Sequence, residues 1–89
     1  MNDPARILVV DDTAHNVKLL ADVLVARGYA VSTASSGKEA LEKVASDAPD
    51  LVLLDVVMPE MSGYEVCKTL RADPATARLP VVMVTALDP

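Results

Sequence analysis

The sequence predicts an α/β domain of three layers (α/β/α), in which helices cover both faces of a parallel β-sheet. Four short runs rich in Val, Ile and Leu recur along the 89 residues, at 7–10, 30–33, 51–54 and 81–84. Three segments with a helical spacing of apolar residues lie between these runs. A regular alternation of strand and helix is the pattern of a parallel sheet joined by right-handed crossovers.

The polarity of the four runs predicts their order in the sheet. The first, third and fourth runs are continuously apolar, which is typical of strands buried on both faces, whereas the second contains Ser32 and Thr33 and suits an edge. We therefore expect the order 2-1-3-4. In such a sheet the order reverses between the first and third strands, and ligands bind at that switch point, beyond the carboxyl ends of the strands.

Three helices are expected from apolar residues spaced three and four positions apart. These residues are Val17, Leu20, Ala21 and Leu24 in the first helix, Ala40, Leu41 and Val44 in the second, and Val66, Cys67 and Leu70 in the third. The second and third helices are preceded by potential capping boxes, Ser36 with Glu39 and Ser62 with Glu65. Residues that end helices follow each segment, namely Gly28, Pro49 and the pair Asp73-Pro74.

The chain is expected to form a single domain over residues 1–89 that stops after its fourth strand. Asp88-Pro89 has the form of a helix N-cap followed by proline at the first helical position, although no further residues follow. This ending indicates a truncated domain. The alternative is a natural four-stranded domain with a polar tail.

The composition argues against several classes of function. The chain has 8 basic and 13 acidic residues and only two aromatic ones, Tyr29 and Tyr64, so direct nucleic-acid binding is not expected. Asp11 and Asp12 interrupt the only hydrophobic stretch near the N-terminus, and no apolar run reaches the roughly 20 residues of a membrane span. The single cysteine, Cys67, cannot form an internal disulfide and is interpreted as a buried residue in a reducing, cytoplasmic environment.

Three carboxylates mark the expected switch point. Asp11 and Asp12 come directly after the first strand and Asp55 directly after the third, so we expect their side chains to converge. Like charges this close repel unless protons or a cation neutralise them. A small cluster of oxygen ligands favours Mg²⁺, which commonly bridges carboxylates to a phosphate, and this outlines a phosphoryl-transfer site. The alternative is that these residues only stabilise the positive end of a helix.

Motifs around these residues resemble the receiver domain of bacterial two-component response regulators. They are Ile-Leu-Val-Val-Asp-Asp at 7–12, Asp-x-x-Met-Pro-x-x-x-Gly at 55–63 and Val-Thr-Ala at 84–86, and the resemblance covers essentially all 89 residues. It implies a flavodoxin-like receiver fold whose fifth strand is missing. It also implies a phosphoacceptor domain of signal transduction, and not an enzyme in itself.

The resemblance implies a role for each matching residue. Asp55 matches the aspartate that accepts a phosphoryl group from a histidine kinase or phosphotransfer protein and signals to an output domain, which is absent from this sequence. Thr85 matches the residue whose hydroxyl bonds the phosphoryl group, and Ala86 matches a residue kept small beside it. The residues that match the Mg²⁺ ligands are Asp11, Asp12, Asp55 and Val57, the last through its backbone carbonyl. From the residues alone, Gly63 is expected to let the chain turn tightly into the third helix.

The resemblance is incomplete at the carboxyl end. Receiver domains continue with a fifth strand that bears a lysine partner of the phosphoryl group, and no basic residue of this chain follows a core strand in that way. We therefore expect phosphorylation to be slow, unstable or absent. We also expect the fourth strand to be an exposed apolar edge, through which copies form a homodimer or exchange elements.

Two other functions are weighed against an active receiver. A degenerate receiver would act only as an interaction module, and Mg²⁺ binding separates it from an active one. A metal-dependent phosphohydrolase of the haloacid-dehalogenase type would carry Asp-x-Asp after the first strand, whereas Asp11 and Asp12 are adjacent.

His15 has no neighbouring base and is interpreted as a solvated helix residue. The beginning Asp-Asp-x-x-x-Asn-x-x-Leu-Leu at 11–20 is similar to receivers joined to cyclases or other nucleotide-signalling domains.

Overall fold

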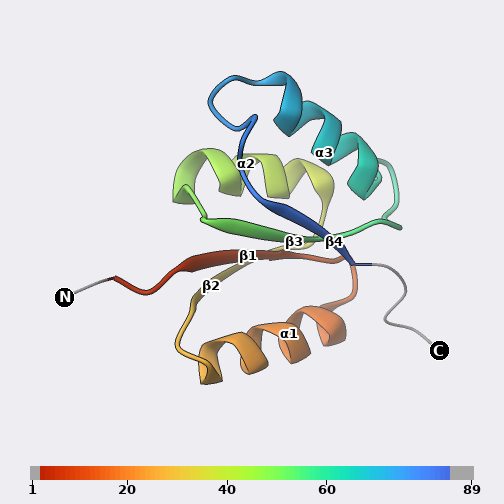
Figure 1. Ribbon diagram of the computed structural model, residues 1–89. Coiled ribbons are helices and arrows are strands. Elements are labelled where there is room, and N and C mark those ends of the chain that lie inside the picture. Colours follow the sequence, from red (N-terminus) through yellow and green to blue (C-terminus); the bar gives the residue numbers. More distant parts are fainter. Residues whose placement is uncertain (1–2, 85–89) are drawn as a thin grey trace.

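The computed structural model describes residues 3–84, which form a parallel four-stranded sheet with helices on both faces (Figure 1). The elements are β1 (Arg6–Val10), α1 (Ala14–Ala26), β2 (Ala30–Ala34), α2 (Gly37–Asp47), β3 (Leu51–Asp55), α3 (Gly63–Ala72) and β4 (Val81–Val84). The strand order β2-β1-β3-β4 confirms the predicted order, and every neighbouring pair is parallel. One prediction differs in detail, because Asp55 is the last residue of β3 and pairs with Val84.

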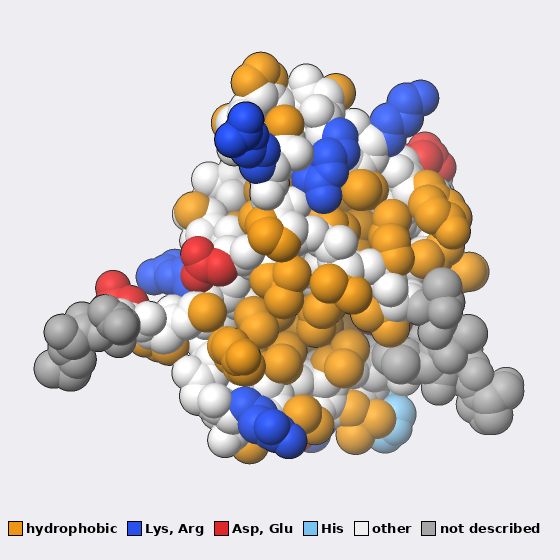
Figure 2. Space-filling view, viewed as in Figure 1, with side chains coloured by type: hydrophobic (Ala, Val, Ile, Leu, Met, Phe, Trp, Pro, Cys, Tyr) orange, Lys and Arg blue, Asp and Glu red, His pale blue; other side chains and the backbone are white. Residues whose placement is uncertain are grey.

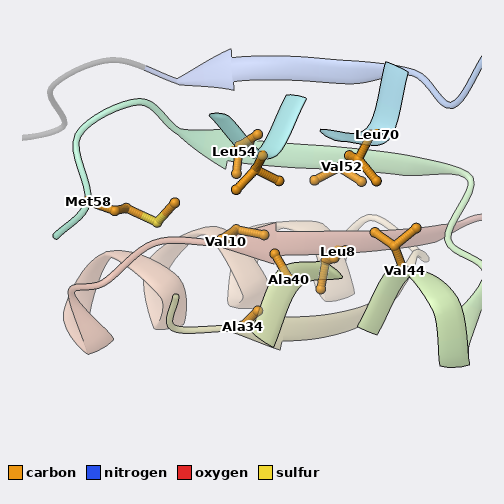
Figure 3. Packing of buried hydrophobic residues seen from close by; sticks show 10 residues of the cluster. Leu8, Val10, Ala34, Ala40, Val44, Val52, Leu54, Met58 and Leu70 are labelled. Atoms are coloured by element: carbon orange, nitrogen blue, oxygen red, sulfur yellow. The ribbon is translucent and has the colours of Figure 1, made fainter. Parts of the chain in front are cut away.

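The core lies between the sheet and the pair α2 and α3, which cover the same face (Figure 1). Alternate strand residues point toward these helices, because successive side chains of a strand lie on opposite faces. Figure 3 shows these residues packed against one another. The strands contribute Leu8, Val10, Val52 and Leu54, and the helices contribute Ala40, Val44, Val66 and Leu70, all of them buried.

Among residues 3–84, α1 alone covers the opposite face of the sheet, and it packs over β1 and β2. Ile7 and Val9 of β1 are buried beneath it, but Leu53 of β3 is half-buried and Val82 of β4 is 48% exposed. The prediction that the third and fourth strands are buried on both faces is therefore wrong for the described residues. Figure 2 shows apolar side chains gathered on the surface between β4 and α1.

The helix ends follow the predicted signals with one change. Gly28 follows the last residues of α1 with φ +94°, and its N–H and that of Tyr29 donate to carbonyls of the last turn, which satisfies backbone acceptors that the helix leaves free. Ser62 and Glu65 form the complete predicted capping box of α3. At α2 only half of the predicted box forms: Ser36 accepts the N–H of Glu39, but the Glu39 carboxylate accepts the N–H of Ser35 at 2.6 Å and not that of Ser36.

Cys67 lies in α3 as expected, but it is half-buried against the core and not fully enclosed. The fold therefore satisfies the main sequence signals. Its largest departure from them is the incomplete burial of Leu53 and Val82 on the α1 face of the sheet.

Candidate functional site

Three carboxylates meet at the carboxyl ends of β1 and β3. Asp11 directly follows β1, Asp55 ends β3, and the register pairs Val10 with Leu54 one residue earlier on each strand. One carboxylate oxygen from each of Asp11, Asp12 and Asp55 lies within 4.8 Å of the others. The predicted convergence of the three side chains at the switch point is confirmed.

Asp11 is the most enclosed of the three residues, with 4% of its surface exposed. Its backbone N–H donates to the Ala34 carbonyl at 3.2 Å, which extends the pairing of β1 with β2 by one residue. Its Oδ1 accepts the N–H of Thr13 at 2.9 Å, and its Oδ2 accepts the Nδ2 amide of Asn16 at 3.4 Å. Neighbouring donors therefore hold both oxygens of this carboxylate, whereas the Asp12 side chain is exposed to solvent.

Asp55 is half-buried, and its Oδ1 accepts the N–H of Val57 at 3.2 Å. Burial raises the pKa of this carboxyl above its ordinary value of 3.8, and the negative charges of Asp11 and Asp12 raise the pKa further. The N–H groups of Val57 and Val56 act in the opposite direction, but the net direction is upward. The site therefore resists carrying three negative charges at once.

The donor set fits a hard divalent cation. All three ligand atoms are carboxylate oxygens, which are the ligands that Mg²⁺ prefers. Among the residues that the structure describes, the one ion pair joins Lys18 and Asp22 on α1, so no lysine or arginine neutralises the cluster there. Asp11 also stabilises the start of α1 by accepting the N–H of Thr13, which agrees with the alternative that the carboxylates stabilise the positive end of a helix. That alternative does not account for Asp55, which lies on β3.

The loop from β3 to α3 packs tightly against the site. Gly63 was expected to permit a tight turn, but its φ is not in the left-handed region, which Glu60 adopts instead with φ 68°. Glycine is required at 63 for space, because a Cβ there would overlap the backbone carbonyl oxygen of Asp55. The same loop leaves Val57 75% exposed and places the Met58 side chain in the core. The start of α3 is thus held against the strand that carries Asp55.

Two predicted site residues, Thr85 and Ala86, lie outside the described residues, so their assigned roles stay predictions. His15 is exposed at the start of α1, which agrees with its interpretation as a solvated residue. The sequence motif at 11–20 includes Asn16 but gave it no role at the carboxylates, whereas its amide donates to Asp11. The sequence signal for this role was the position of Asn16, a polar amide in the first turn of the helix directly before Val17, where the apolar stripe begins.

The chain matches the family model described as the response regulator receiver domain, over residues 7–89. Response regulator PleD of Caulobacter vibrioides is 56% identical over 84 residues, which cover 94% of this chain and 18% of that protein. The alkaline phosphatase synthesis transcriptional regulatory protein PhoP of Bacillus subtilis is 48% identical over 83 residues, which cover 93% of this chain and 34% of that protein. The chain therefore spans only a minor part of these relatives.

Solved structures agree with this assignment. The N-terminal domain of a response regulator receiver protein from Methanoculleus marisnigri superposes with a TM-score of 0.89 at 45% identity, covering 94% of this chain and 70% of that one. Chemotaxis protein CheY4 of Vibrio cholerae gives a TM-score of 0.89 at 34% identity, covering 97% and 72%. In the described part of the chain, no helix has both the length and the apolar character that crossing a membrane requires.

Proposed function

Because the chain belongs to the family of response regulator receiver domains, we propose that Asp55 is the residue that accepts a phosphoryl group from a histidine kinase or phosphotransfer protein. The observation that carries this assignment is the cluster of three carboxylate oxygens within 4.8 Å of one another. Of these carboxylates, Asp55 stands at the end of a strand and is half-buried, so it is held in place and still accessible. Asp11 is too enclosed for the same role.

The reaction is a displacement at phosphorus. A carboxylate oxygen of Asp55 attacks the phosphorus of a phosphohistidine and forms an O–P bond while the P–N bond breaks. The electron pair of the broken bond stays on the imidazole nitrogen, which takes up a proton. The N–H of Val57 holds one oxygen of Asp55 and thereby fixes the orientation of the carboxylate for attack.

We propose that Asp11, Asp12 and Asp55 hold Mg²⁺ together with the backbone carbonyl of Val57. When bound, the ion would offset the negative charge of the carboxylates and of the transferred phosphoryl oxygens. Asp11 contributes a buried and oriented oxygen to this set, and Asp12 contributes an exposed one. From the sequence, we further propose that Thr85 donates its hydroxyl to the phosphoryl group and that Ala86 leaves room for it.

Intact-mass spectrometry after incubation with Mg²⁺ and acetyl phosphate tests the acceptor. Although we expect the reaction to be slow, an acceptor role for Asp55 requires an adduct of one phosphoryl group on the natural chain, none on Asp55→Asn, and none after a chelator removes the metal. Asp22→Asn is the matched control, because Asp22 is an exposed aspartate of α1 that takes no part in the cluster. An adduct that persists in Asp55→Asn would overturn the assignment. Mg²⁺ binding without any adduct would favour a degenerate receiver.

We propose that receiver copies also associate through β4. In the described sheet β4 pairs only with β3, its four residues carry no charge, and Val82 is 48% exposed. Uncharged edge strands recruit other strands, and a lysine on such an edge opposes this pairing. Sedimentation at rising concentration should therefore show a dimer for the natural chain and a monomer for Val82→Lys. A monomer for both would contradict the proposal.

The remaining partners are proposed from charge and from the relatives. The net charge of −5 argues against direct nucleic-acid binding, and we place the domain in the cytoplasm without a membrane partner. We propose that in a longer protein the phosphorylated receiver acts on a separate output domain. Similar proteins include the transcriptional regulatory protein PhoP of Bacillus subtilis and a probable cyclic di-GMP phosphodiesterase of Vibrio cholerae, so we propose a transcriptional or a nucleotide-signalling domain as the output.

A further inference from the structure

Asn16 occupies an unusual position on α1. Its side chain is half-buried, whereas its neighbour His15 is exposed, so Asn16 lies on the side of the helix that faces the sheet. The next positions on that side are the half-buried apolar residues Val17 and Leu20. An amide at the start of an apolar stripe loses part of its hydration, which costs free energy unless a protein group replaces the lost hydrogen bond. Here the Oδ2 oxygen of Asp11 replaces it, at 3.4 Å from Nδ2.

The chemistry of the contact fixes which atom of the amide faces the carboxylate. An ionised carboxylate only accepts hydrogen bonds, so the Nδ2 group of Asn16 must donate to it. With the Thr13 N–H on Oδ1, Asp11 has a donor on each oxygen. Each carboxylate oxygen still keeps a second lone pair, which leaves Asp11 free to bind a cation while its plane is held.

An amide is suited to this place because it brings a donor without a positive charge. A lysine or arginine at the same position would form an ion pair with Asp11 and neutralise part of the cluster. Among the described residues, Asp11 is the only one of the three carboxylates that accepts a hydrogen bond from another side chain. Asn16 therefore orients the most buried of the three ligands and leaves the negative charge of the cluster available to a metal ion.

We infer that Asn16 is a positioning residue for divalent-cation binding, which acts by holding the Asp11 carboxylate in its binding orientation. This inference rests on the proposed metal site at Asp11, Asp12 and Asp55. Partners that orient metal ligands commonly contribute a factor of about 10 to 100 in metal affinity. Loss of the Asn16 amide should weaken Mg²⁺ binding without touching any ligand directly.

The test is the Kd for Mg²⁺, measured by isothermal titration calorimetry on the purified protein without any phosphodonor. Asn16→Leu keeps the size of the side chain but removes the donor, and we expect its Kd to rise about tenfold. Asn16→Ala, which favours a helix, is the second loss variant and should give the same direction. Asn16→Gln retains an amide donor and should give a Kd between those of the natural protein and Asn16→Leu. His15→Ala, one residue away and exposed, is the matched control and should bind as the natural protein does.

Thermal unfolding of the metal-free variants separates positioning from folding. We expect Asn16→Leu to unfold within a few degrees of the natural protein in a chelator but to gain less stability when Mg²⁺ is added. A Kd within twofold of the natural value in both loss variants would overturn the role of Asn16 and leave the metal site intact. Failure of the natural protein itself to bind Mg²⁺ would overturn the metal site as well.

Discussion

The two faces of the sheet are built from the same strands but are packed differently. On the face toward α2 and α3, Leu54 and Val66 are fully buried, whereas on the face toward α1 the adjacent Leu53 is half-buried and α1 itself has no buried residue. On the α1 face, the side chains of β1 and β3 form two rows along the strands, and these rows end at Asp11 and Asp55. Over β3 the α2–α3 face is therefore packed more tightly than the α1 face, and the proposed chemistry lies at the end of the α1 face.

The largest expected effect comes from two adjacent leucines of β3 that point to opposite faces. Leu54→Ala removes a fully buried side chain and should lower the free energy of unfolding by about 3 kcal/mol, because a cavity remains in the core. Leu53→Ala should cost only about 1 kcal/mol, because its side chain is half-buried and water reaches the gap. Urea unfolding of both variants measures the difference, and equal losses would show that the two faces are packed alike.

The second contrast is between two glycines. Gly63→Ala should destabilise the domain by about 1 to 3 kcal/mol, because the new methyl group meets the carbonyl of Asp55 and must push α3 away from β3. It should also slow phosphoryl transfer to Asp55, which a time course of the mass adduct would follow. Gly28→Ala, at the end of α1, has open space but a φ of +94°, so only backbone strain of about 1 kcal/mol is expected. Gly63→Ala with natural stability and rate would contradict the tight packing of the loop.

The third contrast is in the pH dependence of stability. The pKa of Asp55 is raised in the folded state, so the folded chain holds a proton that the unfolded chain has lost, and stability falls as the pH rises from about 3.8 through the raised pKa. The pKa of Glu39 on α2 is lowered, mainly by the backbone N–H of Ser35, so its contribution is present above about 4.5 and is lost as the pH falls through the lowered pKa.

Urea unfolding across pH 3 to 7 tests these opposite signs. Asp55→Asn should raise stability at neutral pH by less than about 1 kcal/mol and remove the decline, whereas Glu39→Gln should lower stability at neutral pH. As the pH falls, the free energies of unfolding of both variants should therefore approach that of the natural chain, Asp55→Asn from above and Glu39→Gln from below. Profiles that shift in the same direction would contradict the assigned causes.

The smallest effect is expected on the outer surface of α1. Val23 is 57% exposed, so Val23→Gln should change the free energy of unfolding by less than about 0.5 kcal/mol. The same substitution at Val66 of α3 buries an amide in the core and should lower the free energy of unfolding by about 2 kcal/mol. Circular dichroism melting of the two variants gives the contrast directly. A large loss at Val23 would mean that a partner covers this part of α1 in solution.

Local patterns were sufficient to predict the elements and the carboxylate cluster. Ser62 and Glu65 lie three residues apart and form the capping box of α3, because a cap depends only on neighbours along the chain. Asp11 and Asp55 could be brought together because parallel strands of order 2-1-3-4 place their carboxyl ends at one edge. The motifs that resemble receiver domains added the family, and the matches to known receivers confirm it.

Other features depend on distances between segments that no local pattern encodes. The half-burial of Leu53 follows from α1 lying over β1 and β2 and not over β3, which the apolar run 51–54 does not reveal. The need for glycine at 63 follows from the approach of α3 to the Asp55 carbonyl. The contact of Asn16 with Asp11 depends on how α1 is set against the end of β1.

The sequence by itself thus determined the elements, the strand order and the residues of the carboxylate cluster, because periodicity and chain connectivity act over a few residues. Only the tertiary structure decided which face is tightly packed, why position 63 must be glycine and which side chain orients Asp11, because these follow from how helices dock on the sheet.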